Sequence, residues 1–139
     1  MIGIAGRGTL SGRIAVTIGL IGVASTSGRT ANDQQNRPWA APPAAVERTN
    51  PLAHRPEAEP GGRKVFHERC AMCHGPDAQG TDKGPSLTAK RVQAQSDGAL
   101  FWKITQGNTH GGMPTFSFLP EPQRWQLVLH LRAIGTRSP

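Results

Sequence analysis

Cys70, Cys73 and His74 are the side chains whose types and spacing most clearly predict a chemistry. They form the CxxCH sequence Cys70-Ala71-Met72-Cys73-His74, which is the attachment signature of a c-type haem. On a helix, residues three and four apart project from one side, so one porphyrin edge can meet both sulfurs. The sequence therefore predicts thioether bonds from both cysteines to the haem vinyl groups, with His74 as the proximal iron ligand.

Three other chemistries use a CxxC pair. Structural zinc takes about four nitrogen or sulfur ligands in two clusters, and the other four histidines form no second cluster with the expected spacing: His54, His67, His110 and His130. A thioredoxin-like dithiol needs a βαβ context, which the pattern around residues 60–90 lacks. A structural disulfide stays open but leaves His74 unexplained, so haem attachment is the preferred interpretation.

Met113 is the predicted second iron ligand. It lies 39 residues after His74, in the sequence Gly111-Gly112-Met113-Pro114. A thioether is a soft, weak ligand that raises the reduction potential relative to a second histidine, and glycines let a backbone approach a flat macrocycle closely. The alternatives are that Met113 only fills a loop or core position, or that His110 is the ligand instead.

The elements that must position these residues are helices. Recurrence every three or four residues predicts a helix over 62–70 that presents CxxCH from its last turn and ends at Gly75 and Pro76. A second helix is predicted over 97–106, with Ser96 or Asp97 as N-cap and Gly107 past its end. A third runs from Pro122 to Ile134 with one apolar stripe. No segment alternates convincingly as a strand, so the fold class is all-α.

Two segments precede the expected domain. Residues 1–27 carry only basic charges and then an uncharged run from Ile14 to Ala24, which is the layout of a secretory signal peptide; an uncleaved anchor is the alternative, although the run falls short of the roughly 20 residues a spanning helix needs. Residues 28–60 are rich in Pro and Ala and are expected to be a solvated linker or a docking arm, with Trp39 and the pair Pro51-Leu52 as residues that could pack.

The folded domain is expected over residues 61–135, with 136–139 as a tail. So short a chain makes only a marginal core alone, and a covalently held haem would serve as core material. Residues 61–139 carry ten basic and five acidic side chains. This excess fits either an ordinary soluble surface or steering toward an acidic docking patch on a partner protein. Nucleic acid is not an expected partner, because no binding motif is present.

The order of four features resembles class I bacterial cytochromes c: CxxCH, then Gly84-Pro85-Ser86-Leu87, then Met113-Pro114-Thr115-Phe116, then a terminal helix over 124–132. The resemblance implies a small fold of three main helices and loops wrapped around one covalent haem c, whose iron is bound by His74 and Met113. It also implies that the carbonyl of Pro85 accepts a hydrogen bond from the His74 imidazole. His130 stands where the family usually has a tyrosine, and export fits because bacteria attach this haem outside the cytoplasm.

The function expected from this reading is single-electron transfer between redox partners by a periplasmic monohaem cytochrome, not catalysis. One alternative is the cytochrome subunit of a periplasmic dehydrogenase complex, with residues 28–60 as its docking arm. The other is a haem-based sensor, a gas-binding protein or a small peroxidase, which applies if Met113 does not bind the iron.

Overall fold

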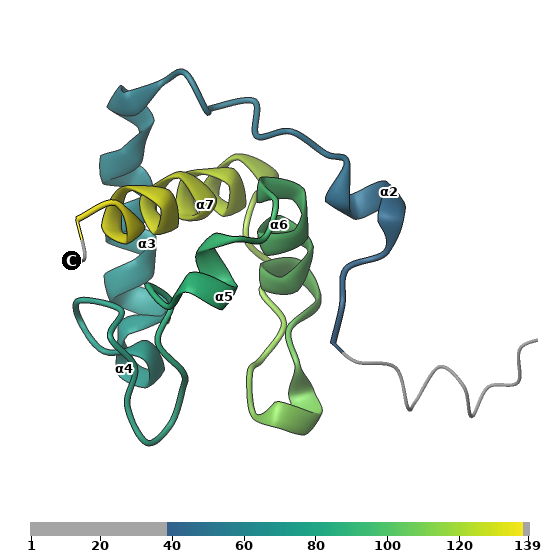
Figure 1. The fold of residues 1–139 in the computed structure, drawn as a ribbon. Coiled ribbons are helices and arrows are strands. Elements are labelled where there is room, and N and C mark those ends of the chain that lie inside the picture. The colour runs from purple at the N-terminus through teal and green to yellow at the C-terminus, as the bar shows by residue number, and fades with distance from the viewer. Residues whose placement is uncertain (1–38, 138–139) are drawn as a thin grey trace, which may run out of the picture. The chain divides into compact units, whose positions relative to one another are not determined.

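Helices α3 (Glu59–Arg69) and α7 (Glu121–Gly135) cross each other and form the centre of the fold (Figure 1). The computed structural model describes residues 39–137. Gly62 of α3 lies at the crossing, directly against the backbone of Gln126 in α7, so the helices approach more closely than any larger residue would allow. Phe66 and Leu127, each 1% exposed, belong to the core that this crossing closes.

Helix α6 (Asp97–Gln106) packs against α7 and coincides with the range predicted from the sequence. The Ser96 hydroxyl caps it by accepting a hydrogen bond from the backbone N–H of Ala99 at 3.1 Å. Gly107, at φ 66°, ends it. The rings of Phe101 and Trp125 stack with centroids 4.0 Å apart, which joins α6 to α7.

The remaining elements are short. They are α2 (Pro43–Val46), α4 (Ala71–His74), α5 (Lys90–Gln93) and the 3₁₀ turns η1 (Pro56–Ala58) and η2 (Thr109–Gly111). Within residues 39–137 there is no strand, only an isolated bridge between Asn108 and Met113. The all-α prediction is confirmed.

The helix that was expected to carry CxxCH in its last turn is instead divided at Cys70. Helix α3 ends at Arg69, Cys70 has φ −113°, and α4 follows as a separate turn. Helical hydrogen bonds are present on both sides of the bend, from Cys70 N to Phe66 O (2.8 Å) and from His74 N to Cys70 O (3.0 Å). The chain therefore changes direction at Cys70 while its backbone groups stay paired. Gly75, at φ 81°, then stops the helix as predicted. Helix α7 extends one residue beyond the expected range at each end, which is within the usual variation of helix boundaries.

Part of the segment 39–58 packs on the helical domain, which a fully solvated linker would not do, and residues 59 and 60 already belong to α3. Ala45 and Asn50 are buried, and the Asn50 amide donates to the carbonyl of Trp125 at 3.2 Å. Burial of Asn50 and its hydrogen bond anchor this segment on the domain, which its Pro and Ala residues would not do by themselves. The predicted segment 1–27, residues 28–38 and residues 138–139 lie outside the described residues, and the boundary at 61 stays a prediction.

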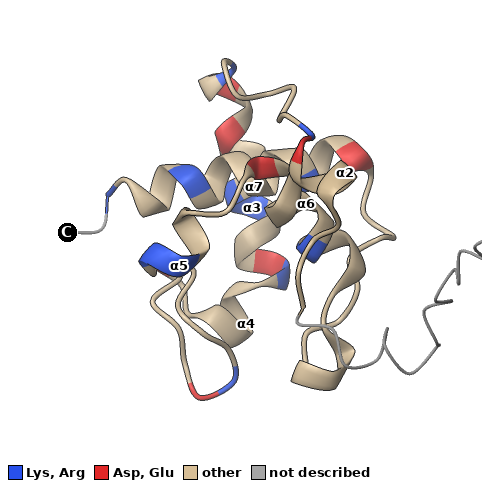
Figure 2. Cartoon of the chain, turned by 45° about the vertical axis from the view of Figure 1, so that its right-hand side comes forward, with Lys and Arg blue, Asp and Glu red and all other residues tan. Residues whose placement is uncertain are grey.

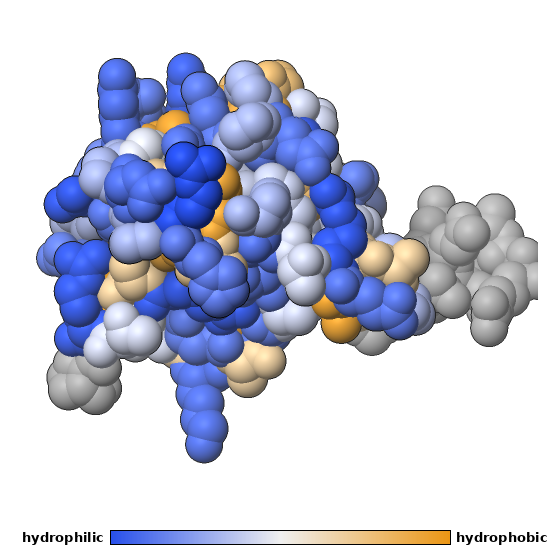
Figure 3. Space-filling view, turned by 90° about the horizontal axis from the view of Figure 1, so that it is seen from above, coloured by the Kyte–Doolittle hydropathy of each residue, from blue (hydrophilic) through white to orange (hydrophobic). Residues whose placement is uncertain are grey.

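Twelve buried apolar side chains make up the core: Val65, Phe66, Ala78, Leu100, Phe101, Ile104, Phe116, Leu119, Trp125, Leu127, Val128 and Leu131. They come from α3, α6, α7 and the loops between them. Outside, the face seen from above is mainly hydrophilic with small apolar patches (Figure 3). The core is therefore concentrated where the three main helices meet.

Candidate functional site

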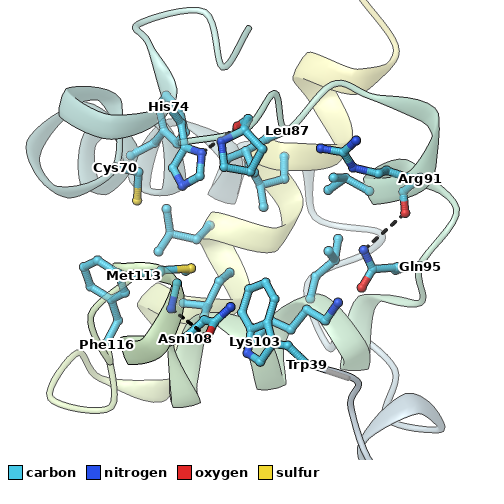
Figure 4. A pocket seen from close by; sticks show the side chains of 18 residues that line it. Trp39, Cys70, His74, Leu87, Arg91, Gln95, Lys103, Asn108, Met113 and Phe116 are labelled. Carbon is cyan, nitrogen blue, oxygen red and sulfur yellow. Dashed lines mark hydrogen bonds between the residues drawn. The ribbon is translucent and has the colours of Figure 1, made fainter. Parts of the chain in front are cut away.

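A cavity of about 440 Å³ lies between the motif-bearing segment, α5, α6 and the loop that carries Met113. Its size is within the range of roughly 300–1,000 Å³ that is usual for cofactor pockets. Most of its lining is apolar, including Phe66, Leu100, Ile104, Leu127 and Leu131. Figure 4 shows His74 and Cys70 on one side of this cavity and Met113 on the other.

His74 is 8% exposed and its ring points into the cavity (Figure 4). Its Nδ1 atom lies 2.8 Å from the carbonyl oxygen of Pro85. Because a carbonyl only accepts, this contact requires the proton on Nδ1 and leaves Nε2 free to bind a metal. A Cβ atom on Gly84 would come within 3.1 Å of the ring, so the imidazole packs closely against the backbone of Gly84 as well as bonding to Pro85.

Cys70 lines the cavity, whereas Cys73 is half-buried and not among its lining residues. The two cysteines form no disulfide with each other. Burial, together with the neighbouring Cys73, raises the pKa of the Cys70 thiol to about 12, so this sulfur stays neutral and sits in apolar surroundings. Met72, between them, is 77% exposed and turned toward solvent.

Met113 is held at the cavity by a tight loop. Its backbone N–H donates to Asn108 O at 2.9 Å, and its carbonyl accepts from Asn108 N at 2.8 Å. Gly112 adopts φ 82° within this loop, a conformation that glycine allows at low cost. The Met113 sulfur projects into the cavity from the side opposite His74 (Figure 4). His110 is exposed and does not line the cavity.

Sequence reasoning named Trp39 as a residue that could pack but did not place it at the cavity, and it missed the other polar lining residues: Arg91, Gln95, Lys103 and Asn108. One signal was available for Lys103, because it follows Leu100 by three residues and precedes Ile104, at the edge of the apolar face of α6. Trp39 and Arg91 reach the cavity only through the tertiary fold. No local pattern marks them.

The donor set fits a haem. An imidazole and a thioether face each other across an apolar cavity, and a thiol of the CxxCH motif lies at its edge. The helical fold and this site together define a c-type cytochrome. Residues 57–131, more than half of the chain, match the family described as cytochrome c oxidase, cbb3-type, subunit III. The chain belongs to this family, and its cofactor is covalently bound haem c with its iron.

Electron transfer through this haem, with redox proteins as partners, is the function that the family implies. Lys and Arg residues occur on several elements, α5 and α7 among them, and Asp and Glu residues are interspersed with them along the chain (Figure 2). Within residues 39–137 no helix combines the length and apolarity needed to cross a membrane.

Proposed function

We propose that this protein is an exported class I monohaem cytochrome c that transfers single electrons between protein partners. In this proposal, Cys70 and Cys73 hold the haem by thioether bonds, and His74 and Met113 are the two axial ligands of the iron. The haem supplies a one-electron couple. The protein keeps both ligands in position in both oxidation states and shields the cofactor from water.

The observation that carries the proposal is the placement of His74 and Met113 on opposite sides of one apolar cavity. His110, the competing ligand, is exposed and lies outside the cavity lining. The contact between His74 Nδ1 and Pro85 O supports the role of Pro85 in orienting the proximal ligand. With both sides of the iron occupied, a substrate would find no open position, which favours a carrier over an enzyme.

Export to the periplasm rests on residues 1–27, whose charge and hydropathy pattern is that of a signal peptide. The expected partners are a donor and an acceptor protein, each with an acidic patch that complements the net positive charge of the chain. Brief contacts of small area suit a carrier that must leave each partner quickly.

A second candidate is a permanent subunit of an oxidoreductase complex, either an oxidase, as the name of the family suggests, or a periplasmic dehydrogenase. The contacts of residues 39–56 with their own domain weigh against the use of that part of the arm for docking. Purification of the untagged protein from its native membrane and periplasmic fractions separates the two candidates, because a permanent subunit would elute with its complex.

The test of the proposal is the optical spectrum of the protein expressed with export to the periplasm. A low-spin spectrum in both oxidation states, unchanged when carbon monoxide is added to the reduced protein, is the expected result. A high-spin spectrum that changes with carbon monoxide would refute the carrier and favour a sensor or gas-binding protein. Retention of covalent haem after Cys70→Ser and Cys73→Ser together would refute the attachment site.

A further inference from the structure

The haem cavity has two chemically different ends. Cys70 lies at one end, and four polar or amphipathic side chains gather at the other: Trp39, Arg91, Gln95 and Lys103 (Figure 4). Among the described residues that line the cavity there is no Asp or Glu. Two cations therefore border a largely apolar space, and within the described part of the chain no ion pair joins either of them to a carboxylate.

Lys103 is held in place by Trp39. Its Nζ atom lies over the indole ring, 4.6 Å from the ring centroid, a distance at which the ring quadrupole attracts a cation. The indole is fixed in turn, because its Nε1–H donates to the carbonyl of Gly107 at 2.7 Å. Burial lowers the pKa of Lys103, which is the response of an ammonium group that has lost part of its water without gaining an anion.

Trp39 belongs to the arm of residues 39–56, which precedes the family match at residue 57. The arm is anchored on α6: the Ser96 hydroxyl donates to Val46 O at 2.7 Å, and a Cβ atom on Gly98 would lie 2.0 Å from Ala45 O. Arg48 adds an ion pair with Glu121 at 2.6 Å. These contacts hold the middle of the arm on the domain, and the hydrogen bond from Trp39 to Gly107 holds its start at the cavity.

The chemistry of haem indicates what the two cations meet. The two vinyl groups, which the cysteines bind, lie on one edge of the macrocycle, and the two propionate carboxylates lie on the opposite edge. A carboxylate that enters a partly buried site needs a charged hydrogen-bond donor to offset its lost hydration. Arg91 and Lys103 are such donors, at the end of the cavity away from Cys70.

We infer that Lys103 and Arg91 bind the haem propionates and that Trp39 is a positioning residue that holds Lys103 there, so that the arm 39–56 is part of the redox site. The inference rests on the proposed function, because it takes the orientation of the haem from its bonds to the cysteines. A cation that neutralises a propionate favours ferrous over ferric iron, since the ferric site carries one more positive charge. Removal of either cation therefore lowers the midpoint potential.

The test is a redox titration of the full-length, haem-loaded protein and its variants. Lys103→Gln and Arg91→Gln are expected to lower the midpoint potential, whereas Lys90→Gln, which removes a charge outside the cavity lining from the same short helix as Arg91, shifts it less. Trp39→Ala is expected to lower the potential in the native protein but not further in Lys103→Gln. That dependence separates positioning of Lys103 from simple exposure of the haem to water.

The inference is overturned if Lys103→Gln shifts the potential no more than Lys90→Gln, or if the Trp39→Ala shift is equally large in the Lys103→Gln background. The far-red methionine-to-iron band reports separately on the axial ligand. Its absence from the native protein would refute the proposed function, and its retention in all variants shows that the measured shifts do not come from loss of the methionine ligand.

Discussion

A Cβ atom on Gly62 would lie 1.9 Å from the carbonyl oxygen of Gln126, so α3 and α7 meet backbone to backbone where they cross. The crossing matters for the site because α3 leads directly into the CxxCH segment, and Leu127 and Leu131 of α7 line the haem cavity. A change in the distance between the helices would displace two walls of the cavity together.

Gly62→Ala is expected to destabilise the haem-loaded protein by about 1–3 kcal/mol, because the added methyl group forces the helices apart. Gly61→Ala is the matched control. Its Cβ atom meets only the side chain of Gln126, at 2.7 Å, and that side chain can rotate away. Because alanine favours a helix over glycine by about 1 kcal/mol, the control is expected to be neutral or slightly stabilising. Denaturant unfolding that shows equal losses for both variants would contradict this account of the crossing.

Asn50→Ala is expected to cost about 1–3 kcal/mol, since it removes a buried amide that donates to Trp125 O and accepts from Leu52 N at 2.8 Å. Thr49→Ala, at an exposed neighbouring position, should stay within about 0.5 kcal/mol of the native protein. Thermal unfolding of the two variants measures the difference. Equal stability would mean that the arm is not anchored at this point.

His130 and Glu59 are expected to make the protein less stable in acid. His130 Nδ1 lies 2.7 Å from Glu59 Oε1. Burial, together with the charges of Arg137 and His67, lowers the pKa of His130 although Glu59 acts to raise it. Burial alone would raise the pKa of Glu59. The hydrogen bond from His130 and the charges of Arg63 and Arg137 outweigh this effect, so the pKa of Glu59 is lowered. Both lowered pKa values are consistent with a neutral His130 imidazole that donates a hydrogen bond to an ionised Glu59 carboxylate.

Both groups bind more protons in the unfolded chain, so stability falls as the pH falls, first below the ordinary histidine value of 6.5 and then below the ordinary glutamate value of 4.5. His130→Gln keeps a donor but cannot titrate, so its melting temperature should fall less between pH 7 and pH 5. His54→Gln, at an exposed histidine that is not among the groups acting on His130, should change the native dependence less than His130→Gln does. A weaker pH dependence in the control variant than in His130→Gln would contradict the role given to His130 and Glu59.

Much of the site could be predicted from the sequence, because its chemistry is carried by short local signals. CxxCH, the Gly-Gly-Met-Pro loop and the caps at Ser96 and Gly107 each depend on neighbouring residues only. The bend at Cys70 has no such signal, since it changes one backbone angle within an otherwise helical pattern.

The packed arm and the polar end of the cavity were harder to predict for a different reason. Asn50 and Trp39 are fixed by single hydrogen bonds to Trp125 and Gly107, 75 and 68 residues away in the chain. A segment rich in Pro and Ala shows no apolar periodicity from which such contacts could be inferred. His130 was visible as a departure from the family pattern, but its partner Glu59 was not.

The central claim is that Met113 is the second ligand of the haem iron, and the far-red absorption band of the oxidised protein tests it most directly. Met113→Ala should abolish this methionine-to-iron band and leave covalent haem in place, whereas His110→Ala, three residues earlier in the same loop, should retain the band. A Met113→Ala protein that keeps the band, or a His110→Ala protein that alone changes its low-spin spectrum, would contradict the account.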